Sequence, residues 1–154
     1  MIDQKRRKLL KGSLGVGLVA GAGLLSPQAL LAAWPEAAFT AEDKAAAMKD
    51  LLGSETFENS DAVKIEAPPV AENSAAVRVT VSTDLEDAKS ITIFAAGNQR
   101  PLIASFELPE HAVPYVSLNI KMAETADVIA VVQTPKGLFG AARMVEVTAG
   151  GCGA

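Results

Sequence analysis

Seven strand-length segments, separated by turn residues, constrain the fold of this chain most. They recur about every ten residues, which is typical of an antiparallel sandwich and not of a parallel α/β sheet. Residues 77–81 alternate between valine and polar side chains, which predicts that the three valines share one buried face. The other segments are residues 63–65, 91–94, 102–108, 116–122, 127–134 and 138–148. A single cysteine excludes an intramolecular disulfide, so the core must be held by packing alone.

One helix is predicted before the strands. Thr40 suits the N-cap position, and Glu42 and Asp43 place acidic side chains in the first turn. An apolar stripe continues to Leu52, and Gly53 is placed to end the helix. The expected fold is therefore all-β, with one N-terminal helix and a flexible C-terminal tail.

The N-terminal segment has the three parts of an export signal. Arg6 and Arg7 lie in a basic block, the apolar run 14–25 is too short to cross a membrane comfortably, and small residues follow near residue 33. The arginine pair resembles a twin-arginine signal, which predicts export to the periplasm in the folded state. We expect a signal peptide over residues 1–33 and a mature domain over residues 34–148. An N-terminal membrane anchor is the alternative.

The net charge limits the partners. Without the first eleven residues the chain keeps 9 basic and 17 acidic residues, a formal charge of −8. Such a domain is repelled by phosphate, so nucleic acid and anionic membranes are poor partners. We expect the mature protein to bind other proteins and no membrane.

The inventory of catalytic and metal-binding residues is small. One cysteine and one histidine are too few for a metal site, and no glycine-rich phosphate loop precedes a helix. His111, between Pro109 and Pro114, is interpreted as a solvated turn residue, although a Cys-His pair remains open. The acidic pair Glu86 and Asp87 is interpreted as turn charges. We therefore expect no catalytic residue, metal or cofactor.

The C-terminal segment 149–154 carries the only cysteine. Cys152 is flanked by Gly150, Gly151 and Gly153, so no side chain larger than a methyl group surrounds its sulfur. A free thiol has a pKa of about 8.5 and is mostly protonated at neutral pH, so another protein must activate it. Four residues beyond Thr148 reach roughly 13 Å when extended. This pattern indicates a swinging arm for covalent chemistry, with an interchain disulfide in an assembly module as the alternative.

The tail 150–154, the twin-arginine pair and the strand segments resemble the SoxY family, the sulfur-carrier subunits of the Sox thiosulfate-oxidation system. The resemblance covers nearly the whole chain, and the Gly-Gly-Cys-Gly block is its specific part. It implies an Ig-like β-sandwich that is not itself an enzyme. It also implies that Cys152 is the covalent attachment site and that Gly150, Gly151 and Gly153 form the arm.

The resemblance implies partners as well. A SoxZ-like β-sandwich subunit would form a heterodimer with this chain. A c-type cytochrome would load thiosulfate onto the thiol, a hydrolase would release sulfate, and a sulfane oxidase would act on the remaining sulfur. Ubiquitin-like sulfur donors are a poorer match, because they end in glycine and this chain ends in Ala154.

Overall fold

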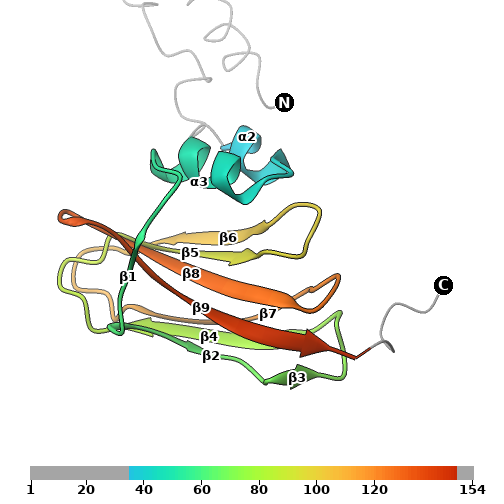
Figure 1. The fold of residues 1–154 in the computed structure, drawn as a ribbon. Coiled ribbons are helices and arrows are strands. Elements are labelled where there is room, and N and C mark those ends of the chain that lie inside the picture. The colour runs from blue at the N-terminus through green and yellow to red at the C-terminus, as the bar shows by residue number, and fades with distance from the viewer. Residues whose placement is uncertain (1–34, 149–154) are drawn as a thin grey trace, which may run out of the picture. The chain divides into compact units, whose positions relative to one another are not determined.

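The fold of residues 35–148, which the computed structural model describes, is a sandwich of two β-sheets with helices on one side (Figure 1). The helices are α2 (Glu36–Thr40) and α3 (Lys44–Leu52). The strands are β1 (Glu58–Asn59), β2 (Val63–Glu66), β3 (Val70–Ala71), β4 (Val77–Thr83), β5 (Ser90–Ala95), β6 (Leu102–Glu107), β7 (Tyr115–Ile120), β8 (Ala126–Thr134) and β9 (Gly137–Val147).

The larger sheet has the order β1-β9-β8-β5-β6, and β3 also pairs with β9; the smaller sheet has the order β2-β4-β7. The seven predicted strand segments correspond to β2 and to β4 through β9, and these seven strands pair with one another only in the antiparallel sense. The all-β sandwich is therefore confirmed. The sequence did not predict β1 and β3, two-residue strands that both run parallel to β9.

The main core lies between the two sheets. Val77, Val79 and Val81 of β4 are at most 2% exposed, while Arg78 between them is exposed, so the predicted alternation is confirmed. Ile91 and Ile93 of β5 face the same core from the larger sheet. Packing of these β-branched side chains therefore stabilises the core without an intramolecular disulfide.

The central strands of the larger sheet, β5 and β8, are buried on both faces. Phe94 of β5 and Val131 of β8 point away from the main core and pack against Met48 of α3 in a second apolar cluster. Figure 1 shows α2 and α3 together on one side of the larger sheet. Because strands covered on both sides need apolar residues at every position, residues 128–132 form an uninterrupted apolar run instead of an alternating one.

The predicted helix start is wrong by three residues. Thr40 is the last residue of α2, and its hydroxyl donates to the carbonyl oxygen of Glu36 at 2.8 Å. The N-cap of α3 is Asp43, whose carboxylate accepts a hydrogen bond from the backbone N–H of Ala46 at 2.9 Å. Gly53 ends α3 in the left-handed conformation with φ of 75°, as predicted. Two short helices thus replace the single predicted one.

Replacing Asp43 with alanine should destabilise the domain by about 1 kcal/mol, because the first turn of α3 loses its capping acceptor. Chemical denaturation of the two proteins measures this difference in unfolding free energy. Glu42→Ala is the matched control, because it removes a neighbouring negative charge but leaves the capping bond of Asp43 in place. Equal losses in both variants would show that charge near the helix, and not the cap, is responsible.

Candidate functional site

The predicted attachment and signal residues lie outside the described residues. These are Cys152, Gly150, Gly151 and Gly153 at the C-terminal end, and Arg6 and Arg7 at the N-terminal end. The predicted division into residues 1–33, 34–148 and 149–154 consequently stays a prediction. The structure does describe the point from which the C-terminal segment starts, the end of β9.

Strand β9 is paired along both of its edges. On one side it pairs with β8 over nine residue pairs, ending at Ala126 opposite Val145. On the other side β1 pairs at Phe139 and Gly140, and β3 pairs at Glu146 and Val147. Figure 1 shows the C-terminal end of β9 beside β3. The last strand before the cysteine segment is therefore built into the sheet up to its final residue.

Val147 and Thr148, here called the arm root, are held from two sides. The backbone N–H of Thr148 donates to the carbonyl oxygen of Ala71 at 3.2 Å. On the opposite side, the backbone N–H of Val147 donates to the hydroxyl oxygen of Thr125 at 2.9 Å. One residue earlier, the N–H of Glu146 donates to the carbonyl oxygen of Pro69 at 2.9 Å. The arm root thus has a defined position within the fold.

The two loops that hold the arm root are joined to each other. The backbone N–H of Met122 donates to the carbonyl oxygen of Ser74 at 2.9 Å, which links the loop after β7 to the loop after β3. The side chain of Asn98 braces the loop after β7, because it donates to Lys121 O at 2.7 Å and accepts from Ala123 N at 2.8 Å. None of these contacts was predicted, since the three loops are distant in sequence.

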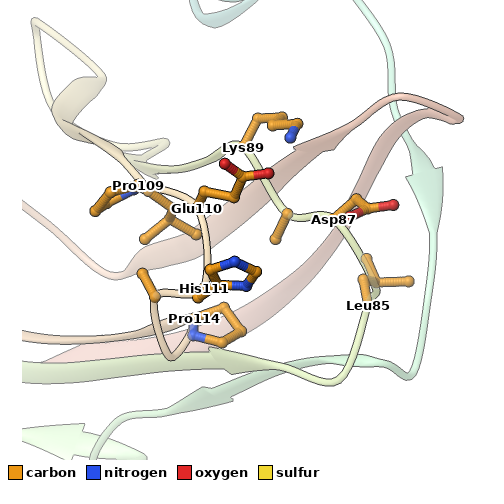
Figure 2. Close-up of a pocket in the computed structure, with 10 residues that line it drawn as sticks. Leu85, Asp87, Lys89, Pro109, Glu110, His111 and Pro114 are labelled. Carbon is orange, nitrogen blue, oxygen red and sulfur yellow. The ribbon is translucent and has the colours of Figure 1, made fainter.

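A separate pocket of about 240 Å³ is lined by His111 and lies between the segment before β5 and the connection from β6 to β7. In Figure 2 the imidazole projects between Glu110 and Pro114 toward the segment that carries Asp87. Both His111 and Asp87 have positive φ angles, 67° and 55° respectively. His111 is exposed in a turn, as the sequence predicted.

This pocket and the arm root lie at opposite ends of the strands. The pocket adjoins the start of β5, whereas the braced loop with Asn98 follows its end, so roughly 17 Å of strand separates them. Four extended residues beyond Thr148 span at most about 14 Å. A catalytic pair between His111 and Cys152 is therefore not favoured by the geometry.

Within residues 35–148, one exposed ion pair shifts a pKa. The pKa of Lys64 is raised by its hydrogen bond to Asp84 and by the charge of that carboxylate. Both side chains are exposed: Lys64 lies on strand β2, and Asp84 lies in the turn after β4.

Within residues 35–148, no group of three or more histidine, cysteine and acidic side chains could hold a metal ion. No helix in this range is long and apolar enough to cross a bilayer.

The chain matches known sulfur oxidation proteins. Residues 48–152 match the family model described as sulfur oxidation protein SoxY. The sulfur carrier protein SoxY from Chlorobium limicola f thiosulfatophilum is 41% identical, with a TM-score of 0.61 over 66% of this chain and 93% of that protein. An all-β sandwich with these matches defines a sulfur oxidation protein. The chain belongs to the SoxY family.

Two further solved structures resemble the chain loosely. An engineered protein has a TM-score of 0.39 at 16% identity, covering 56% of this chain and 20% of its own. A chain from a study of T cell activation by the superantigen toxic shock syndrome toxin-1 has the same TM-score at 8% identity, covering 56% of this chain and 99% of its own. No curated protein sequence matched the chain. These two likenesses carry no argument about function.

Proposed function

We propose that this protein is a periplasmic covalent carrier of thiosulfate-derived sulfur, with Cys152 as its attachment site. The observation that carries the proposal is the extent of the family match, which runs over residues 48–152 and therefore ends on that cysteine. The related Chlorobium protein is itself described as a sulfur carrier. The paired end of β9 supports a carrier as well, because it supplies a firm base for a short arm of Gly150, Gly151 and Gly153.

The proposed chemistry needs only a thiol from this chain. A c-type cytochrome would join the thiol to thiosulfate, forming a sulfur–sulfur bond, releasing one proton and accepting two electrons. A hydrolase would add water to the resulting S-thiosulfonate, releasing sulfate and a proton and leaving a persulfide on Cys152. A sulfane oxidase would then act on the persulfide. The carrier would bind no cofactor and catalyse no step, because the partner enzymes would supply the catalytic groups.

The carrier would act as a heterodimer with a SoxZ-like subunit. Membership of the SoxY family supports a place in the Sox system. Strands β2, β6 and β7 are each an outer strand of their sheet, and outer strands are where a second β-sandwich protein can add contacts. Size-exclusion chromatography of the two co-expressed chains checks this part of the proposal.

The direct test is the intact mass of the mature protein, isolated from cells given thiosulfate, before and after reductant. Reductant-sensitive additions that match sulfane sulfur or thiosulfonate, and that vanish in Cys152→Ala, are the expected result. The same spectrum fixes the cleavage site of the signal peptide. A free thiol or a disulfide-linked dimer under every growth condition would instead favour an assembly module.

Gly151→Val should reduce sulfur loading strongly while leaving heterodimer formation unchanged. A β-branched side chain widens the arm next to the thiol and restricts its backbone, so the arm should fit poorly into a narrow enzyme channel. The rate of adduct formation at Cys152 measures the effect, and Ala154→Val is the control for added bulk beyond the thiol. Normal turnover by Gly151→Val would remove the threading argument.

A further inference from the structure

We propose that Thr125 is a positioning residue, which fixes the point where the arm leaves the domain and thereby sets the depth that Cys152 can reach. This inference rests on the carrier function proposed above and deepens it. It concerns the arm root, Val147 and Thr148, and not the arm itself.

The side chain of Thr125 extends the sheet by one hydrogen bond. Backbone pairing between β8 and β9 ends at Ala126 opposite Val145, two residues before the arm root. The hydroxyl oxygen of Thr125 then accepts from the backbone N–H of Val147 at 2.9 Å, where the next ladder bond would stand. A side chain therefore decides whether the strand stays attached at this edge up to residue 147.

Thr125 can hold the arm root because its own loop is held. Asn98 makes two hydrogen bonds to this loop, and Met122 N–H bonds to Ser74 O. Ala71, the last residue of β3 and the one before this second loop, accepts a hydrogen bond from the backbone N–H of Thr148 through its carbonyl oxygen. The arm root is thus attached to two loops that are attached to each other, so its place relative to both loops is set.

A fixed arm root limits the conformational entropy that the arm must lose when it enters an enzyme. Cys152 is the fourth residue beyond Thr148, a span of roughly 13 Å when the chain is extended. If Val147 and Thr148 detach, two more residues are free and must be ordered again at each encounter. Ordering one residue costs enough conformational entropy to weaken association by roughly 5- to 30-fold. Loss of the Thr125 bond should therefore weaken loading without changing its chemistry.

The test compares Thr125→Val with Thr125→Ser and Thr56→Val in the full-length mature protein with its partner subunit. Valine keeps the shape of threonine but removes the acceptor, whereas serine keeps the hydroxyl. Thr56 is exposed and lies between α3 and β1, away from the arm root. With the c-type cytochrome and thiosulfate, Thr125→Val should raise KM for the carrier about tenfold with kcat nearly unchanged, since only binding is weakened. The serine variant and the Thr56 control should behave as wild type.

Two further measurements separate positioning from a structural or chemical effect. Hydrogen exchange at the Val147 amide should accelerate in Thr125→Val, and alkylation of Cys152 by iodoacetamide should keep its rate, because a small reagent needs no reach. Unchanged exchange at Val147, or faster exchange with an unchanged KM, would overturn the assignment of Thr125. Absence of loading in the wild-type protein would instead reject the carrier function. Hydrogen exchange at the Val147 amide would then still test whether Thr125 holds the arm root.

Discussion

Cys152→Ser should abolish sulfur loading completely and leave the free energy of unfolding within about 0.5 kcal/mol of wild type. Serine cannot form a persulfide or an S-thiosulfonate, and the chain has no other thiol to substitute. The two apolar clusters of the described residues consist of side chains between Ala38 and Val147, and both keep all of these members in the variant.

Intact mass after incubation with the loading enzyme measures the first effect, and urea denaturation measures the second. Serine is close to cysteine in size, so the variant tests the sulfur atom and little else. A stability loss above about 1 kcal/mol would indicate that the C-terminal segment packs against the domain. Adducts that persist in the variant would place the attachment site on another residue.

Gly140→Ala should destabilise the domain by about 3 kcal/mol, the largest effect we expect from adding one methyl group. A Cβ at this position of β9 would stand 2.6 Å from Cδ2 of Phe57 and 2.7 Å from the carbonyl oxygen of Ala130. Phe57 can rotate, but the carbonyl oxygen belongs to the neighbouring strand β8, whose residues 128–132 are all buried. Relief of the second contact requires movement of the sheet itself.

Thermal and urea denaturation of Gly140→Ala test this expectation. Ala142→Val is the matched control, because residue 142 lies two positions along the same strand and is exposed. We expect that control to change stability by less than about 0.5 kcal/mol. Phe57→Leu combined with Gly140→Ala should recover only part of the loss, and full recovery would show that the Ala130 contact is unimportant.

The sequence predicted the seven longer strands because each has its own local pattern. Alternating valines indicated β4, which has one buried and one partly exposed face. The apolar run 128–132 indicated the strand β8. That run did not reveal that helices cover its second face, because periodicity does not identify what buries a residue. The Gly53 stop of α3 was also predicted, since a left-handed residue after a helix favours glycine.

Other features depend on residues that are distant in the chain. Glu58 and Asn59 are polar and form β1 only because β9 offers an edge to pair with. Thr40 and Asp43 are both residue types that favour the N-cap position, but Thr40 is the last residue of α2 and Asp43 caps α3. The arm root could not be predicted either, because Thr125 reaches Val147 across 22 positions and Ala71 reaches Thr148 across 77.

The double pairing of β9 has a consequence for how the chain is made. Its partners β1 and β3 lie about 75 to 80 residues earlier, so the contacts that complete the larger sheet have high contact order. They cannot form until the last strand has left the ribosome, only a few residues before the cysteine. A chain that ends before β9 would lack the strand that pairs with β8, β1 and β3, and we expect it not to fold stably. A transport route that accepts only folded proteins would then favour molecules whose synthesis had come within a few residues of Cys152.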